Sequence, residues 1–409
     1  MKRKYSFLVF ILSLTHLVNA QSDFIDKIEL DLIPGEVQHI NLSEENSSLA
    51  IKSVRKLEEL NLKLENENIE LKPDLHIENE GLYTSNLIFL NPGTKNLSIS
   101  SQFRTNLQLF LLKVPKINVN QEISKYQTDS CEEPLGIDQD VWRSGLPAPT
   151  ISPTLNQVNH CVIHHSAGSN TATDYIEVVR NIYTFHTGVN GWDDIGYNYL
   201  IAQDGTLFHG RDGQNLYSDD NVRGAHFCGK NTGTMGVCLL GDYTTVVPTL
   251  AALSTLEDLL LWKLNKESLQ PGDSAIHPLP GGDYLGRVVG HQDGCATACP
   301  GTFLYADIPG IIDSLEDRID NCPTPSSIHF TNTSYELAIY PQPASDIIII
   351  SSKEKGMLFI YDLIGREIFK VKKTHEQLKI NTNAYPRGTY TLKLLTKDRQ
   401  MKGKILVQP

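Results

Sequence analysis

Beyond its first twenty residues, the 409-residue sequence has no long hydrophobic run, no excess of positive charge and no His-Glu-x-x-His motif. Without a run of about 18 to 20 apolar residues, we expect no transmembrane helix in the rest of the chain. The formal net charge of −12 argues against nucleic acid as a partner and provides no polybasic membrane patch. The missing motif excludes the helix that carries the base of many zinc proteases.

The first twenty residues have the three parts of a secretory signal. Lys2-Arg3-Lys4 is positively charged, Phe7 to Leu17 is apolar but too short to span a bilayer, and Val18-Asn19-Ala20 fits a cleavage site. We therefore expect residues 1–20 to be removed and the mature chain to begin at Gln21. No cysteine follows the cleavage site, which argues against lipid anchoring there.

The remaining chain divides into three parts by pattern. Residues 21–130 alternate short apolar runs with turns, as in Leu60-Asn61-Leu62-Lys63-Leu64, and this β-rich pattern predicts a small sandwich. Residues 131–322 alternate strands and helices and predict an α/β domain with a central mixed sheet and flanking helices. The expected helices are Thr171–His186, capped by Asn170 or Thr171, Thr249–Lys266 and Phe303–Ile319. Residues 323–337 form a Pro/Ser/Thr/Asn-rich linker before a final β-rich segment, 338–409.

Three stretches of the central part contain candidate metal ligands and a candidate catalytic group. They are His164-His165-Ser166, Trp192 to Tyr199, and Gly290-His291 with Cys299 eight residues later. Two imidazoles and a thiolate suit zinc and leave a fourth position open for a water whose pKa falls to roughly 7. Taken singly, each piece has a structural explanation: imidazoles at a strand end, a buried thiol or disulfide cysteine, and a core tyrosine.

The stretch from about Gly136 to Ile319 resembles the peptidoglycan recognition protein family, the type 2 N-acetylmuramoyl-L-alanine amidase domain. It is also similar to the small bacteriophage amidases of that family. The motifs that carry the resemblance are Val162-Ile163-His164-His165-Ser166, Gly191-Trp192 through Asn198-Tyr199, Gly224-Ala225-His226, Gly236-Val237-Cys238-Leu239-Leu240-Gly241-Asp242, and His291 with Cys299.

The resemblance assigns roles to individual residues. It implies that Zn²⁺ is held by His164, His291 and Cys299, and that Tyr197 and Thr297 assist catalysis. Thr297 stands where phage-type members carry lysine, so it offers a hydroxyl and no fixed cation. Substrate binding falls to two further histidines: His226, in a loop beside the groove, and His165, which alternation along a strand turns away from the metal. Three carboxylates lie near the motifs, either supporting a ligand histidine or solvated in turns: Asp193, Asp194 and Asp293.

The implied activity is hydrolysis of the amide bond between N-acetylmuramic acid and L-alanine in peptidoglycan. Two alternatives stay open: a non-catalytic peptidoglycan-binding recognition module, and a surface adhesin. Family members that lack the cysteine ligand bind without cutting, so the presence of Cys299 and Tyr197 favours the enzyme. The preferred stem peptide, the target cell wall and the role of residues 21–130 (wall docking, carbohydrate contact or spacing) are not decided by the sequence.

The seven cysteines fit an exported protein with one metal ligand. Six remain when Cys299 is set aside, and six allow fifteen pairings. Cys131 and Cys322 flank the amidase-like region and could clip its ends, and by the family resemblance Cys228 and Cys295 lie in groove-side loops and could pair. The last two lie in apolar runs and could be free buried thiols: Cys161 and Cys238.

Residues 338–409 resemble the C-terminal sorting domain of type IX secretion. The resemblance rests on Ile339-Tyr340-Pro341-Gln342-Pro343-Ala344, Ile360 to Arg366 and Arg387 to Leu392, with Gln342 in place of the usual asparagine. It implies the type IX secretion machinery as a partner and a secreted or cell-surface location. The alternative is a small immunoglobulin-like appendage without a sorting role.

Overall fold

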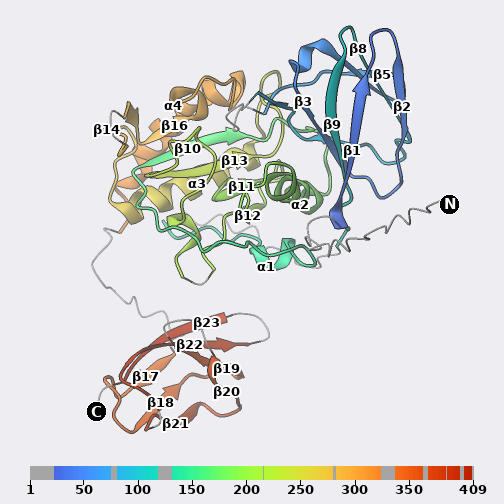
Figure 1. The fold of residues 1–409 in the computed structure, drawn as a ribbon. Helices are drawn as coiled ribbons and strands as arrows, with labels where there is room; N and C mark the ends of the chain where they lie inside the picture. The colour runs from blue at the N-terminus through green and yellow to red at the C-terminus, as the bar shows by residue number, and fades with distance from the viewer. Residues whose placement is uncertain are drawn as a thin grey trace, which may run out of the picture. The chain divides into compact units, whose positions relative to one another are not determined.

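The computed structural model describes residues 23–74, 81–117, 131–214, 216–279, 282–323, 337–362, 367–383, 385–396 and 400–407. The chain forms two compact units, residues 1–325 and 326–409 (Figure 1). The predicted signal segment, 1–20, and most of the predicted linker, 323–337, lie outside the described residues.

The N-terminal part of the first unit is a sandwich of two antiparallel sheets. Its strands are β1 (Ile25–Leu32), β2 (Val37–Asn41), β3 (Ser48–Ser53), β4 (Leu60–Leu64), β5 (Glu67–Ile69), β6 (Tyr83–Thr84), β7 (Ile88–Phe89), β8 (Asn96–Ser101) and β9 (Thr105–Leu112). One sheet has the order β1-β9-β3-β6 with β7 beside β3, and the other has β2-β8-β4-β5. Leucines at alternate positions of β4 are buried and the residues between them are exposed, which confirms the predicted β-rich part.

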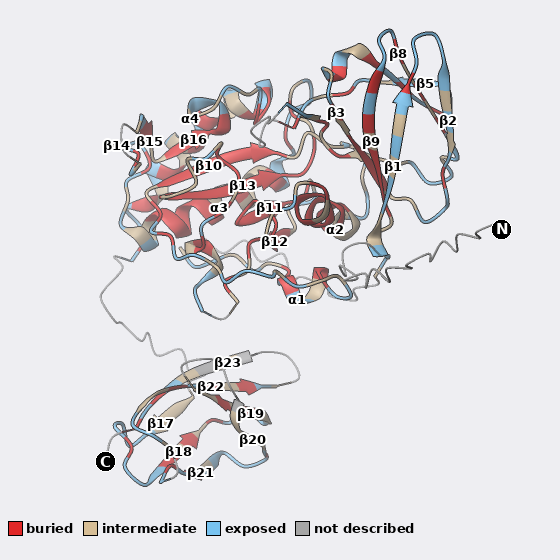
Figure 2. Ribbon diagram, viewed as in Figure 1, coloured by how far each residue is buried: buried red, intermediate tan, exposed pale blue. Residues whose placement is uncertain are grey.

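A five-stranded mixed sheet forms the centre of the first unit. Its strands are β10 (His160–His165), β11 (Tyr199–Ile201), β12 (Leu207–His209), β13 (Thr234–Leu239) and β16 (Val288–Gly290), in the order β12-β11-β13-β10-β16. All the pairings are parallel except the β11–β12 hairpin. Both faces of β10 and β13 are buried, as Figure 2 shows, and this is the burial expected for parallel strands covered on two sides.

Helices cover both faces of this sheet, which confirms the predicted α/β architecture. Helices α3 (Leu250–Glu267) and α4 (Thr302–Ile319) share one core with the sheet, and α2 (Tyr175–Thr184) packs on the other side. The predicted cap of α2 was wrong: the Asp174 carboxylate caps it by accepting the Glu177 amide at 2.9 Å. The remaining elements are short: α1 (Gln139–Trp142), a π-helical turn Phe185–Val189, and the hairpin β14 (Ser274–Ile276) with β15 (Tyr284–Gly286).

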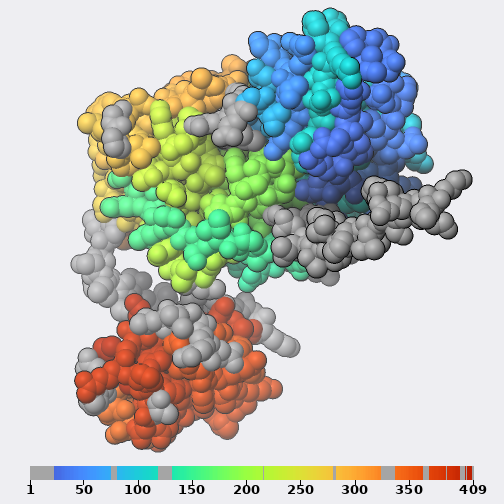
Figure 3. Space-filling view, viewed as in Figure 1, coloured from blue at the N-terminus to red at the C-terminus, as the bar shows by residue number. Residues whose placement is uncertain are grey.

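The N-terminal sandwich packs directly on α2. Phe110, Leu112 and Val114 belong to the same buried cluster as Val179 and Ile182 of α2. In the space-filling view the blue-to-cyan sandwich lies against the green central part (Figure 3). The two parts therefore share a continuous hydrophobic core within the first unit.

Two disulfides link distant parts of the first unit. Cys131 pairs with Cys322 across 191 residues, and Cys228 pairs with Cys295. These are the two pairings that the sequence suggested. The other three cysteines are free and buried: Cys161, Cys238 and Cys299.

The second unit is also a β-sandwich. One sheet has β17 (Ala338–Tyr340), β18 (Ile347–Ser351) and β21 (Gln377–Asn381), and the other β19 (Gly356–Tyr361), β20 (Glu367–Lys373), β22 (Gly388–Leu395) and β23 (Gln400–Val407). The Gln342 side chain bonds to the backbone of β23, at Lys404 O and Leu406 N. In the described part of the chain, no helix has both the length and the apolar character needed to cross a bilayer.

Candidate active site

Parallel strands bring the two predicted histidine ligands together. β10 and β16 pair in register, with Ile163 opposite Gly290. The residues that follow these partners are His164 and His291, and their ring centroids lie 4.5 Å apart. Because neighbouring parallel strands end at the same edge of a sheet, residues 127 positions apart become adjacent.

Cys299 joins the two histidines in one buried group. The His165 amide donates to Cys299 Sγ at 3.3 Å, and this sulfur lies 3.7 Å from His164 Nδ1. One ligand atom each of His164, His291 and Cys299 falls within 4.8 Å of the others. The Thr297 hydroxyl accepts the Cys299 amide at 3.1 Å and so fixes the loop that carries the thiol.

This donor set fits a zinc ion. Zn–N and Zn–S bonds of about 2.0 to 2.3 Å in tetrahedral geometry place donor atoms roughly 3.5 Å apart, which agrees with the 3.7 Å between His164 Nδ1 and Cys299 Sγ. Burial raises the pKa of the Cys299 thiol to about 12. A bound cation is therefore what would hold the thiolate at neutral pH.

His226 lies behind His164 and not on the predicted substrate surface. Its Nδ1 is 3.0 Å from His164 Nε2, and its Nε2 is 3.3 Å from the Thr234 hydroxyl. Only 1% of His226 is exposed. A Cβ on Gly236 would lie 2.6 Å from the His226 ring, so a glycine is required where the ring packs. The structure thus places His226 against the ring of His164, a position that its place in a polar loop did not indicate.

Tyr197 precedes β11 and lies against the histidines. Its ring centroid is 5.2 Å from that of His164, and its hydroxyl is hydrogen-bonded to the Cys238 thiol. Burial, followed by the nearby Cys238 and Cys299, raises the pKa of Tyr197 well above its ordinary value. Tyr197 is therefore a neutral phenol that can donate a proton in a hydrogen bond.

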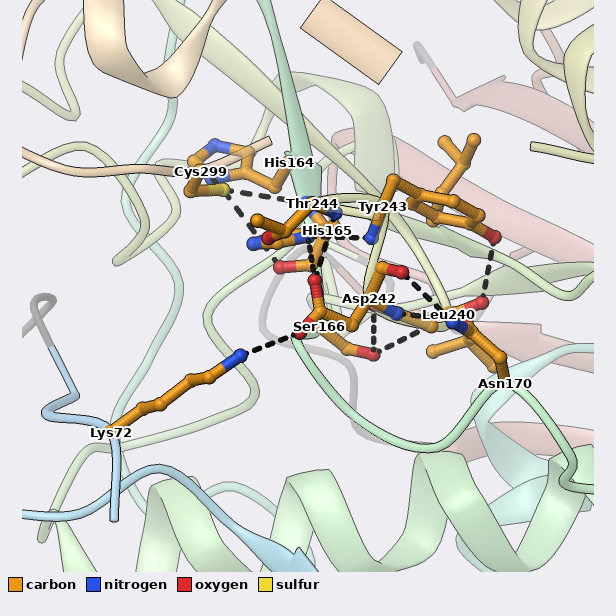
Figure 4. Close-up of polar contacts among 12 residues, drawn as sticks. Lys72, His164, His165, Ser166, Asn170, Leu240, Asp242, Tyr243, Thr244 and Cys299 are labelled. Atoms are coloured by element: carbon orange, nitrogen blue, oxygen red, sulfur yellow. Dashed lines mark hydrogen bonds and ion pairs between the residues drawn. The ribbon is translucent and has the colours of Figure 1, made fainter. Parts of the chain in front are cut away.

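His165 faces a polar network that reaches into the N-terminal sandwich (Figure 4). Its Nδ1 accepts the Tyr243 amide at 3.2 Å and lies 3.7 Å from Asp242 Oδ1. Asp242 also accepts the Lys72 ammonium at 2.8 Å and the Thr244 amide at 2.9 Å. Desolvation opposes ionisation of Asp242, but these hydrogen bonds outweigh it and lower the Asp242 pKa to about 2. The carboxylate is therefore permanently charged at neutral pH.

The three carboxylates near the motifs hold the backbone or an arginine. Asp193 pairs with Arg211 at 2.7 Å, and Asp194 accepts two backbone amides. Burial raises the pKa of Asp194 to about 7. Asp293 accepts the Gly290 amide at 2.7 Å, which fixes the backbone just before His291.

A cavity of about 430 Å³ opens beside the histidines and the thiol. Several predicted site residues line it: His165, Tyr197, Thr297 and Cys299. The sandwich contributes residues that sequence reasoning did not single out, among them Glu70, Lys72, Asp74 and Leu87. None of them belongs to a recognisable motif, and each lines the cavity only because the sandwich packs against the central domain.

Comparisons with known proteins identify the families to which two parts of the chain are similar. The family model for N-acetylmuramoyl-L-alanine amidase matches residues 154–302, and the model for the secretion system C-terminal sorting domain matches residues 338–408. Peptidoglycan-recognition protein SC2 of Drosophila melanogaster is 31% identical over 174 residues, covering 42% of this chain and 83% of that protein. Human N-acetylmuramoyl-L-alanine amidase is 29% identical over 196 residues, 47% of this chain and 27% of that protein.

A solved structure of Drosophila PGRP-LB, 27% identical, covers 42% of this chain and 91% of that one, with a TM-score of 0.34. The family model and the Drosophila relative place the central domain in the class of peptidoglycan amidases and peptidoglycan-recognition proteins. The chain belongs to the peptidoglycan-recognition protein and N-acetylmuramoyl-L-alanine amidase family and carries a C-terminal secretion sorting domain.

Proposed function

We propose that this protein is a secreted zinc-dependent N-acetylmuramoyl-L-alanine amidase, and that residues 131–322 form its catalytic domain. The observation that carries the proposal is the buried group of His164, His291 and Cys299, whose ligand atoms lie within 4.8 Å beside Tyr197 at the cavity. Three protein ligands leave one coordination position open, which is the pattern of catalytic zinc. The substrate is the amide bond between N-acetylmuramic acid and L-alanine.

Each residue of the site has a part in this reaction. His164, His291 and Cys299 would hold the zinc, which when bound would supply a Lewis acid and an activated water. The Tyr197 hydroxyl donates a hydrogen bond to the oxyanion that develops on the scissile carbonyl, an effect of about 2 to 4 kcal/mol. The Thr297 hydroxyl accepts the backbone amide of Cys299 and in this way positions the Cys299 thiolate.

His226 contributes through the ligand His164. Its contact with His164 Nε2, backed by Thr234, fixes the ring orientation and selects Nδ1 as the atom that faces Cys299. His165 lies on the cavity surface, where we propose that it contacts substrate. The assignment of His226 to substrate binding is replaced by this orienting role.

Metal content and product analysis test the function. Purified protein should contain about one zinc per chain, and digestion of muropeptides should release intact stem peptides beginning with L-alanine, detected by mass spectrometry. The same digests establish whether lysine or diaminopimelate stems are preferred. A zinc-free protein that binds muropeptides without releasing peptide would instead identify a recognition module, the other activity that the family includes.

We propose that export is directed by an N-terminal signal and by the C-terminal sorting domain. The N-terminal signal would direct the protein across the inner membrane, and the sorting domain, residues 338–409, would direct it through the outer membrane by type IX secretion. Two disulfides in the first unit fit a protein that folds outside the cytoplasm.

A further inference from the structure

The N-terminal sandwich forms one side of the active-site cavity, and we propose that its Lys72 binds a carboxylate of the peptide stem. This inference rests on the proposed peptidoglycan substrate. It assigns a substrate-binding role to a domain that lies outside the residues matched by the amidase family, 154–302. The carboxylate is the one on the acidic residue that follows L-alanine in the stem.

The sandwich is held firmly enough to form a defined surface of the cavity. Ser47 and Ser48 both donate to the Asn181 side chain of α2, at 2.7 and 2.6 Å. The Lys52 ammonium donates to the Val189 carbonyl at 2.6 Å, and Asn190 donates to Asp74 at 3.0 Å.

The sandwich and α2 also share a buried apolar cluster, to which Leu87 of the cavity lining belongs. Apolar packing and several polar bonds thus fix the position of this surface relative to the catalytic residues. A cavity built from two such docked parts is pre-organised for its ligand.

Lys72 supplies the positive charge of this cavity. Among the described residues that line it, Lys72 is the only lysine or arginine. Thr297, beside the thiol, is uncharged, and both Glu70 and Asp74 on the sandwich side are acidic. Among the described lining residues, Lys72 is therefore the one permanently charged cation with which a substrate carboxylate can pair.

The Lys72 ammonium has capacity for a second anion. Among the described residues, the bond that the ammonium makes to Asp242 at 2.8 Å uses one of its three N–H donors, and the side chain is 42% exposed. Asp242 fixes the position of the ammonium, as Figure 4 shows, so little side-chain entropy is lost when a substrate carboxylate binds. The first acidic residue of the stem lies one residue from the scissile bond, and Lys72 lines the same cavity as Tyr197 and Cys299.

The test compares two synthetic muramyl pentapeptides that differ only at the acidic residue after alanine, which carries either a free carboxylate or a carboxamide. Wild-type protein should show a KM about tenfold to a hundredfold lower for the carboxylate form, the range for hydrogen bonds to a charged group. Lys72→Met should remove this preference by raising KM for the carboxylate form alone, with kcat retained. Lys72→Arg should keep it. Lys56→Met, an exposed sandwich lysine outside the cavity lining, should behave as wild type.

The outcomes separate this proposal from the amidase proposal. If wild-type protein cleaves neither peptide, the amidase fails, and the Kd values of the same two peptides then test Lys72 by the same pattern. Equal KM or Kd for both forms in wild-type protein overturns the Lys72 proposal, and this result does not depend on how any variant folds. A fall in kcat for both peptides in Lys72→Met, with KM unchanged, also overturns it, because Lys72 would then act only through Asp242 and His165.

Discussion

His164 Nδ1 lies 3.7 Å from Cys299 Sγ, although 135 residues separate them in the chain. The His165 amide, which donates to the same sulfur at 3.3 Å, also connects this sheet edge to the loop after β16. Replacement of either residue by alanine removes one of three metal ligands. We expect Cys299→Ala and His164→Ala to lose both bound zinc and hydrolysis, measured by metal analysis and muropeptide digestion. Cys161→Ala, another buried free cysteine, should retain both. Full activity with retained zinc in either ligand variant would contradict the assignment of these residues as metal ligands.

Removal of the Tyr197 hydroxyl should lower kcat and leave KM unchanged. Tyr197→Phe removes only the hydroxyl, so zinc content should stay constant while kcat falls by roughly 10²- to 10³-fold, the cost of one oxyanion donor. Tyr183→Phe is the matched control, because that hydroxyl bonds to the Pro147 carbonyl away from the cavity. An increase in KM with kcat unchanged would make Tyr197 a binding residue.

His226 should affect metal affinity more than substrate affinity. Loss of its contact with His164 Nε2 in His226→Ala is expected to weaken zinc binding about tenfold to a hundredfold, measured by chelator competition. With zinc in excess, KM should be near the wild-type value. The opposite pattern, normal zinc affinity with a raised KM, would restore the substrate contact that the sequence suggested.

Ionisation of Asp242 should make the free energy of unfolding depend on pH in the acid range. Its pKa is about 2 in the folded protein against an ordinary value of 3.8. The stabilisation is therefore fully present above about pH 4 to 5 and is lost as the pH falls toward 2. It amounts to about 1 to 2 kcal/mol after allowance for the partly exposed Lys72 partner. In urea unfolding of metal-free protein, Asp242→Asn should be less stable than wild type at pH 6, and the difference should shrink by pH 2. A constant difference would show that the charge is irrelevant.

The sorting domain should be required for the last step of export. A chain truncated before Ala338 is expected to stay in the periplasm of the native host, whereas the full chain reaches the surface or the medium. Fractionation followed by immunodetection distinguishes these outcomes. If the truncated chain is delivered like the full one, the C-terminal unit has no sorting role.

The sequence predicts those parts of the site whose residues carry metal-binding atoms and belong to recognisable motifs. His164 and His291 follow apolar strand residues and Cys299 lies in a loop, and the family resemblance supplied the choice of these three residues as metal ligands. The pairing of Cys131 with Cys322 was suggested by their positions on either side of the amidase-like region, and the pairing of Cys228 with Cys295 was suggested by the family resemblance.

The other features of the site could not be predicted from the sequence, because they depend on tertiary packing. His226 carries the same donor atoms as a ligand, yet only the fold shows that Gly236 makes room for its ring behind His164. The start of α2 was misplaced because Asn170, Thr171 and Asp174 are all good caps, and only the structure shows which one accepts an amide. Lys72 lies in a strand-rich domain without motifs, and its place in the cavity follows from the docking of two domains.

The disulfide between Cys131 and Cys322 determines how tension would pass along the chain. Cys322 lies three residues beyond the end of α4 and precedes the segment that leads to the second unit. A force pulling on the C-terminal unit, as during passage through a membrane or while the protein is held at a surface, reaches Cys322 and crosses the covalent bond to Cys131. The 190 intervening residues, which include the strands and loops of the metal site, lie outside this path. The bridge therefore allows the protein to be pulled or held by its C-terminal end without tension passing through the backbone that carries His164, His291 and Cys299.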